Sequence, residues 1–182
     1  EVVAYGLFVN VDLFRKYALA LPNTPEEFLE CCRVFQENGI ETPIGANRWW
    51  LETFVFALAY ADLYNGGNTE AEIAALNSGE ARYSDYMRPG FAFLQTLIDR
   101  GYVDAEKALV SEAIEGEGED FLAGKTPIVM AYWGAANSET AYARTDFEMQ
   151  VIGFPSSRGQ MPVMPMTGWG VGAHAEHLED AL

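Results

Sequence analysis

The sequence predicts an α/β fold, because short β-rich runs alternate with longer helical segments along most of its length. Three runs carry the strand predictions. Residues 2–9 are rich in valine and aromatic side chains and predict a first strand. The apolar runs 127–132 and 148–154 predict two further strands. Several of the segments between them repeat apolar residues every three or four positions, which is typical of helices.

The most clearly marked helix begins after Thr24 and ends before Gly39. Thr24 can cap the first turn, Pro25 suits the first helical position, and Glu27 completes a capping box. Gly39 is the usual kind of residue just past a helix end. A shorter helix is expected at residues 12–17, directly after the first strand.

The middle of the chain predicts a buried helix between a short strand and a glycine-rich stop. Residues 42–45 predict the strand, and residues 50–64 are nearly apolar all round, as in a central helix. The sequence NGGN at 65–68 ends that helix. Residues 71–84 are interpreted as a polar segment that leaves the core and contains small helical turns. Pro89 is expected to open the next helix.

The amino-acid composition changes twice in the last third of the chain. Residues 111–123 are acidic, with a short helix expected near their end. A further helix is expected at 137–143. From Pro155 onward prolines and glycines are frequent, which predicts an extended crossing segment that ends in a strand at 169–173.

Composition and charge exclude several classes of function. The chain has 182 residues, of which 49% are hydrophobic, so it can form a sizeable core. Its 27 acidic and 11 basic residues give a formal charge of −16, which disfavours nucleic acids and anionic lipid as partners. The longest apolar run, 49–64, is interrupted by polar residues and predicts a buried helix rather than a membrane span.

Neither the cysteines nor the histidines predict a metal or redox site. Cys31 and Cys32 are adjacent, which disfavours a disulfide between them, and we expect two small buried apolar side chains. His174 and His177 provide only half of a zinc site, so an exposed helix start is the simpler interpretation. No metal and no cofactor are expected.

Catalytic motifs are weak. The chain has no Gly-x-Ser-x-Gly nucleophile elbow, and the GWGVG run at 168–172 lacks the spacing of a dinucleotide-binding loop. A carboxylate pair could hydrolyse glycosides, but glycines interrupt the acidic run and favour a solvated loop. That run contains Glu112, Glu115, Glu117, Glu119 and Asp120. We therefore do not expect an enzyme.

The four tryptophans all fall at the ends of predicted elements, where α/β proteins bind ligands. They are Trp49, Trp50, Trp133 and Trp169. A tryptophan at such a place either fills the core or offers a flat surface on which a sugar ring can stack. Polar residues close to them in sequence could bind the hydroxyl groups of that sugar. These are Asn47, Arg48, Thr53, Asn137 and Ser138.

Four stretches together resemble the extracellular solute-binding proteins of ABC importers, in particular the carbohydrate-binding group that is similar to maltose-binding protein. They are GLFVNVDLFRKYALALPNTPEEFLECCRVFQENGIETPI, FVFALAYADLYNGGN, FLAGKTPIVMAYWGAAN, and the return VIGFPSSRGQ…TGWGVGAHAEHLEDAL. The resemblance covers nearly the whole chain and depends on the order and spacing of these motifs.

The resemblance implies one lobe of a two-lobed, type II periplasmic-binding-protein-like fold, with a mixed sheet flanked by helices. Residues 5–154 would form most of the C-terminal lobe, and residues 155–182 a hinge and the start of the other lobe. The N-terminal lobe would be missing, so we expect a fragment of a longer protein. The chain also begins and ends within predicted elements, which supports that expectation.

The resemblance also implies a sugar site and its partners. The site would include Trp133 with Gly134, the loop from Asn47 through Arg48 to Trp50, and the returning Gly168 and Trp169. The full-length protein would be extracytoplasmic, periplasmic or a cell-surface lipoprotein, and would deliver a carbohydrate to a membrane permease. Two alternatives remain open: a binder of another small solute such as a polyamine, which the acidic charge favours, and a sugar-acting hydrolase.

Overall fold

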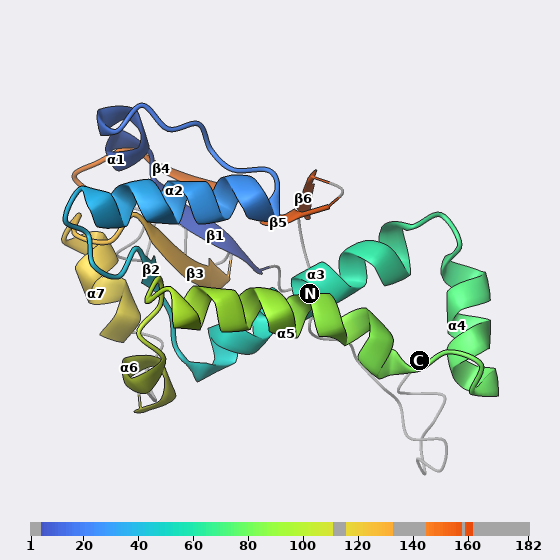
Figure 1. Cartoon of the computed structure of the whole chain (residues 1–182). Coiled ribbons are helices and arrows are strands. Elements are labelled where there is room, and N and C mark those ends of the chain that lie inside the picture. The colour runs from blue at the N-terminus through green and yellow to red at the C-terminus, as the bar shows by residue number, and fades with distance from the viewer. Residues whose placement is uncertain (1–4, 111–115, 133–144, 158, 162–182) are drawn as a thin grey trace, which may run out of the picture.

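A computed structural model describes residues 5–110, 116–132, 145–157 and 159–161 of the chain. Figure 1 shows a small sheet with helices on both of its faces, and a long helical pair that extends to one side of it. The α/β architecture predicted from the sequence is therefore confirmed. The helix expected at 137–143 and the strand expected at 169–173 lie outside the described residues.

The central sheet has four strands in the order β2-β3-β1-β4. They are β1 (Tyr5–Asn10), β2 (Ile44–Gly45), β3 (Ile128–Tyr132) and β4 (Met149–Ile152). β1 pairs antiparallel with both β3 and β4, whereas β2 pairs parallel with β3. The sheet is therefore mixed, as predicted.

Alternating side chains of β1 serve two different cores. Leu7 and Val9 belong to the main core, and Phe8 packs on the other face with Val129 and Phe121. Successive residues of a strand point to opposite faces, so both faces of the sheet must be covered. α7 (Gly116–Leu122) covers the smaller core, and the larger helices cover the main one.

α1 (Val11–Lys16) and α2 (Pro25–Glu37) follow the first strand and confirm two predicted helices. The capping box of α2 forms as expected: Thr24 Oγ1 accepts a hydrogen bond from the Glu27 backbone nitrogen at 3.2 Å, and the Glu27 carboxylate accepts one from the Thr24 nitrogen at 3.3 Å. Gly39, just past the helix, has a φ of 90°, which suits glycine. Both cysteines on α2 are free and buried, as predicted.

The longest helices, α3 (Arg48–Asn65) and α5 (Tyr83–Asp99), pack closely against each other. A Cβ atom at Gly90 of α5 would lie only 2.7 Å from the Cα atom of Val55 in α3. A glycine at this position therefore lets the two helix backbones meet. None of the described helices is long and apolar enough to cross a membrane.

The prediction that Pro89 opens a helix is wrong, because α5 begins six residues earlier. Proline lacks the N–H that would bond to the carbonyl of Asp85, one turn back. Asp85 lies in the first turn of α5 and both residues are exposed, so water can satisfy the freed carbonyl. The sequence pattern cannot distinguish this position from a helix start.

Three shorter helices complete the described helical part. α4 (Thr69–Ser78) is a continuous helix where only small helical turns were expected, and it has no buried residue. It lies at the end of the α3–α5 pair farthest from the sheet (Figure 1). α6 (Ala105–Val110) was not predicted. α7 lies where a short helix was expected, although it begins earlier in the acidic run.

The strand predicted at 148–154 is divided in two. β4 ends at Ile152, and β5 (Phe154–Ser156) forms a separate hairpin with β6 (Gly159–Met161). β5 packs on the main body: the rings of Phe154 and Phe54 meet edge-on, with their centroids 5.5 Å apart. The division into a lobe at 5–154 and a hinge at 155–182 stays a prediction.

Candidate ligand-binding site

The ends of the four strands of the central sheet meet along one side of it, which we call an edge and which is not an outer strand. β3 and β4 both run antiparallel to β1, and β2 runs parallel to β3. The carboxyl ends of β2, β3 and β4 therefore lie at the same edge as the amino end of β1. Ligands of α/β proteins commonly bind outside the carboxyl ends of strands. The structure thus defines an edge at which a ligand site is expected.

The two central strands project beyond their neighbours at this edge. Tyr5 pairs with Tyr132 and Gly6 with Ala131, whereas no described residue of β2 or β4 reaches that far. β2 ends opposite Val129, three residues before the end of β3. At about 3.3 Å per residue, β3 extends about 10 Å farther than β2. This difference leaves a step at the end of the sheet.

A two-residue link joins β2 to α3 beside that step. Asn47 is fully buried, and its carbonyl accepts the first helical hydrogen bond from the Leu51 nitrogen at 3.1 Å. Arg48, the first residue of α3, is exposed. Trp49 and Trp50 follow in the first turn of the helix. The buried Asn47 therefore fixes the start of the helix whose first turn contains both tryptophans.

The structure brings only part of the predicted site together. Asn47, Arg48, Trp49 and Trp50 lie consecutively at the start of α3, and the positions of their backbones agree with the prediction of a loop that enters a helix. Thr53 is almost wholly buried, 2% exposed, and Asn47 is buried as well, so neither side chain lies on the surface of the described part of the chain. Direct contact of either with a ligand stays a prediction.

The remaining predicted site residues lie outside the described part of the chain. Trp133 follows Tyr132, the last residue of β3, directly in the sequence. These residues are Trp133, Gly134, Gly168 and Trp169, together with Asn137 and Ser138. Their part in a site stays a prediction.

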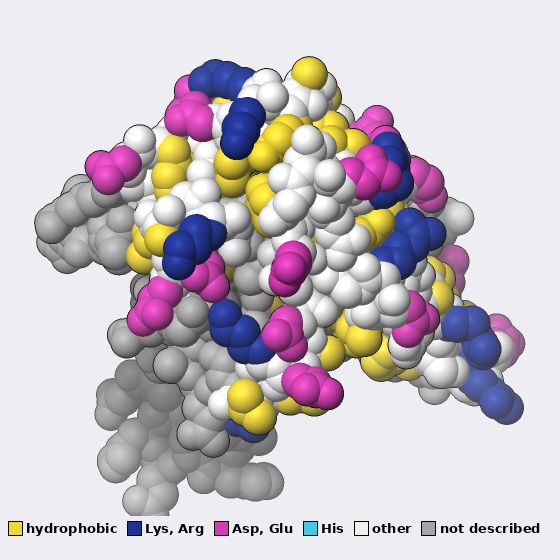
Figure 2. Space-filling view, turned by 60° about the vertical axis from the view of Figure 1, so that its left-hand side comes forward, with side chains coloured by type: hydrophobic (Ala, Val, Ile, Leu, Met, Phe, Trp, Pro, Cys, Tyr) yellow, Lys and Arg dark blue, Asp and Glu magenta, His cyan; other side chains and the backbone are white. Residues whose placement is uncertain are grey.

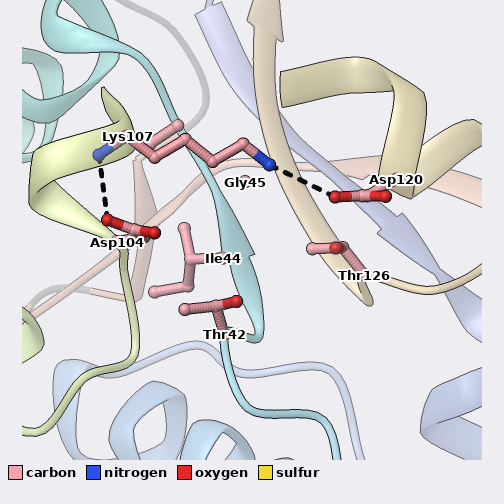
Figure 3. Close-up of a pocket in the computed structure, with 8 residues that line it drawn as sticks. Thr42, Ile44, Gly45, Asp104, Lys107, Asp120 and Thr126 are labelled. Carbon is pink, nitrogen blue, oxygen red and sulfur yellow. Dashed lines mark hydrogen bonds and ion pairs between the residues drawn. The ribbon is translucent and has the colours of Figure 1, made fainter. Parts of the chain in front are cut away.

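A small pocket beside β2 is lined by the ion pair of Lys107 and Asp120 (Figure 3). The ammonium of Lys107 lies 3.3 Å from one carboxylate oxygen of Asp120, and that of Lys125 lies 3.4 Å from the other. These hydrogen bonds lower the pKa of Asp120. The pocket's volume of about 30 Å³ suits a water molecule, not a sugar. This ion pair joins α6 to α7 and has a structural role that the spacing in the acidic run did not indicate.

Surface charges of both signs are mixed over the face in Figure 2. Several are paired: Arg33 contacts Glu30 and Glu37 on α2, and Arg15 contacts Glu148. Among the described residues, no group of three histidine, cysteine or acidic side chains could hold a metal ion. In the stretch from β2 into α3, residues 44–53, Glu52 is the sole acidic residue in the sequence. This stretch therefore does not supply a carboxylate pair.

Solved structures share this fold. A family 1 extracellular solute-binding protein from Bifidobacterium longum subsp. infantis matches 85% of this chain and 40% of its own, with 18% identity and a TM-score of 0.67. A chitin oligosaccharide binding protein matches 86% and 39%, with 19% identity and a TM-score of 0.67. A sugar transporter from Bacillus licheniformis in complex with stachyose matches 98% and 48%, with 21% identity and a TM-score of 0.67.

A mixed sheet flanked by helices, with the carboxyl ends of three strands on the same side, is the kind of α/β lobe in which ligands commonly bind at those ends. A family profile for bacterial extracellular solute-binding proteins matches residues 1–181, and the chain belongs to that family. It spans less than half the length of the three solved structures above, as one lobe of a two-lobed protein would. A search among curated proteins finds no match.

Proposed function

We propose that the chain supplies one wall of a carbohydrate site in the receptor of an ABC importer. Two findings support the proposal. The chain belongs to a family of extracellular solute-binding proteins. Structures of similar fold include a chitin oligosaccharide binding protein and a sugar transporter in complex with stachyose.

The arrangement at the sheet edge is the observation that carries this proposal. The short link after β2 places the start of α3, with its two tryptophans, beside the step formed by β1 and β3. β3 runs directly into Trp133 in the sequence. Trp49 and Trp50 thus belong to a helix that begins near the end of β3, and Trp133 is the next residue after β3 in the sequence.

Recognition would require no chemistry. The tryptophan rings provide flat apolar area, about 150–250 Å² each, on which the C–H faces of a sugar ring can stack. Polar groups around them fix the orientation of the hydroxyl groups. Arg48, exposed at the start of α3, is one such group. Asn47, which is fully buried, acts by positioning the helix start.

The remainder of the site belongs to the longer protein that we propose. Residues 5–154 would form most of its C-terminal lobe, and residues 155–182, which include Gly168 and Trp169, would form a hinge toward the other lobe. Hinge closure around the sugar would exclude water from it. The closed receptor would then deliver the sugar to a membrane permease outside the cytoplasm.

Saturation-transfer NMR with the 182-residue chain tests the proposal, because it detects dissociation constants near about 1 mM, or about −4 kcal/mol of binding free energy. The probes are stachyose, a chitin disaccharide and spermidine. We expect transfer to at least one of the sugars and none to spermidine. Trp50→Ala and Trp133→Ala should each weaken sugar binding by about 30-fold, the effect of losing about 2 kcal/mol from an aromatic hot spot.

A matched control tests whether the loss of any exposed aromatic side chain, and not only of a tryptophan in the proposed site, weakens sugar binding. Phe91 is 58% exposed and lies on α5, so Phe91→Ala should leave sugar binding unchanged. Transfer to spermidine alone would replace the proposal by polyamine binding, and release of shorter sugars would replace it by hydrolysis. Sugar binding that survives both tryptophan variants would contradict the proposed site.

A further inference from the structure

A second, larger pocket lies at the opposite edge of the sheet. Its open volume is about 380 Å³, which is within the range of small-molecule sites. It is open to solvent and is lined by the end of β1, helix α1, the end of α7 and the residues before β4. These elements meet at the left-hand end of the sheet in Figure 1. The proposed carbohydrate site lies at the other end, so this pocket is separate from it.

Asn10 places a buried amide in this pocket. The residue is 2% exposed, and its side-chain oxygen accepts a hydrogen bond from the Leu13 nitrogen at 3.1 Å. Its Nδ2 atom has no hydrogen-bond partner among the described residues. Among the described residues, every wholly buried side-chain nitrogen or oxygen has a hydrogen-bond partner. Because the Nδ2 atom of Asn10 has none, it is not wholly buried and is accessible from the pocket. A buried donor of this kind is costly unless it finds an acceptor.

Two opposite charges line the same pocket without pairing with each other. Lys16 forms no ion pair with the described residues, and its ammonium lies over the ring of Tyr17, 5.0 Å from the centroid. Asp146 is exposed and also has no ion pair among the described residues. Asp12, by contrast, is occupied, because it accepts a hydrogen bond from the Glu148 nitrogen and lies 3.6 Å from Arg15.

The pocket also has an apolar wall. Phe147 lines it, and its ring is held edge-on against Phe121 with a centroid distance of 5.3 Å. Leu13 and Leu122 line it as well. Gly124, with a φ of 71°, turns the chain past Asn10 and Phe147. The pocket is thus lined by a buried amide, by the exposed side chains of Lys16 and Asp146, and by an apolar surface.

We propose that this pocket binds a small zwitterion, an α-amino acid with an apolar side chain. Its carboxylate would accept hydrogen bonds from Asn10 Nδ2 and Lys16, and its ammonium would pair with Asp146. Its side chain would lie against Phe147. A zwitterion could pair with both Lys16 and Asp146, whereas a ligand with a single charge could pair with only one of them.

Amide chemical-shift titration of the chain with leucine tests this proposal. We expect saturable shifts at Gly124 and Phe147. Isovaleric acid, which lacks the ammonium, and isoamylamine, which lacks the carboxylate, should each bind at least tenfold more weakly. Galactose serves as the saccharide probe and should produce no saturable shift at these residues.

Two variants test the roles of the pocket residues. Asn10→Asp keeps the side-chain oxygen that bonds to Leu13 but replaces the amide donor by an acceptor, so leucine binding should fall at least tenfold. Asp146→Asn should reduce it similarly. Asp85→Asn, on the exposed surface of α5, is the control and should leave binding unchanged.

Thermal unfolding establishes that each variant is folded before its binding is compared. The proposal is overturned if leucine gives no saturable shift, if galactose binds instead, or if leucine binds equally well to Asp146→Asn and the unmodified chain. Because the two sites lie at opposite edges, failure of the carbohydrate proposal would leave the leucine titration unaffected.

Discussion

The contact between α3 and α5 gives a sharp prediction about the stability of the lobe. Gly90 lies where a Cβ atom would meet the backbone of Val55, with 2.7 Å to its Cα atom. Carbon atoms in contact normally lie about 3.5–4.0 Å apart, so the added methyl group of Gly90→Ala overlaps the neighbouring helix. Backbone inside a packed helix cannot move aside as a flexible side chain can. The two helices would have to separate.

The size of the effect follows from two opposing terms. Overpacking a well-packed contact costs up to about 3 kcal/mol. Alanine favours the helix over glycine by about 1 kcal/mol, which offsets part of that cost. The net loss in the free energy of unfolding is therefore about 2 kcal/mol. For a chain of this size it corresponds to a fall in Tm of about 4–8 °C.

Urea unfolding followed by circular dichroism measures this change directly. Ala92→Gly is the matched control, because Ala92 is exposed on the same helix and should lose about 1 kcal/mol through helix propensity alone. In α5, glycine should thus be the better residue at position 90 and alanine the better one at position 92. A Gly90→Ala variant as stable as the unmodified chain, or more stable, would refute the close approach of the two helices.

Three further predictions concern capping, charge and thiol burial. Thr24→Ala should lower the free energy of unfolding by about 1 kcal/mol in urea melts, because Oγ1 caps the Glu27 nitrogen, whereas Thr24→Ser should change it little. Hydrogen bonding to lysine lowers the pKa of Asp120, so its stabilisation is present near pH 7 and is lost as the pH falls below about 4. Asp120→Asn should remove that pH dependence in melts at several pH values, with at most about 0.5 kcal/mol involved after solvent screening, and an unchanged profile would contradict the pairing. Burial raises the pKa of the Cys31 thiol to about 11 and raises that of Cys32 well above its ordinary value, so both should react with a thiol reagent near pH 8 far more slowly in the folded than in the unfolded chain. Equal rates would contradict their burial.

The sequence predicted correctly those helices that are determined by residues close to one another in the chain. α2 is an example: a cap at Thr24, an acidic partner at Glu27 and a stop at Gly39 all act within a few residues of one another. α3 was predicted from its apolar composition, because a helix that is apolar all round must be buried. Such elements need no knowledge of the rest of the fold.

Elements that depend on tertiary contacts were predicted poorly. Proline is common at the first position of a helix, so Pro89 predicts a helix start. In the structure α5 packs on α3 and begins six residues earlier. α4 has no buried residue and therefore no apolar face that periodicity could reveal. The break at Gly153 separates β4 from β5, whose Phe154 packs against Phe54 of α3, a contact between residues far apart in the sequence.

The candidate sites show the same division. The sequence placed Trp49 and Trp50 at a helix start, which the structure confirms for their backbone, but it could not supply the strand register that forms the step at the sheet edge. Nor could it indicate the second pocket. Asn10 caps α1 in the structure, and only the fold brings it to the same pocket as Asp146, more than a hundred residues away.

The most direct measurement of the central claim is an amide chemical-shift map recorded with the sugar that binds best. The carbohydrate proposal predicts that shifts concentrate at Gly6, Gly45 and the start of α3, and that Trp133→Ala weakens the binding that causes them by about 30-fold. Sugar-dependent shifts confined to α4, or to the opposite edge around Gly124, would contradict it.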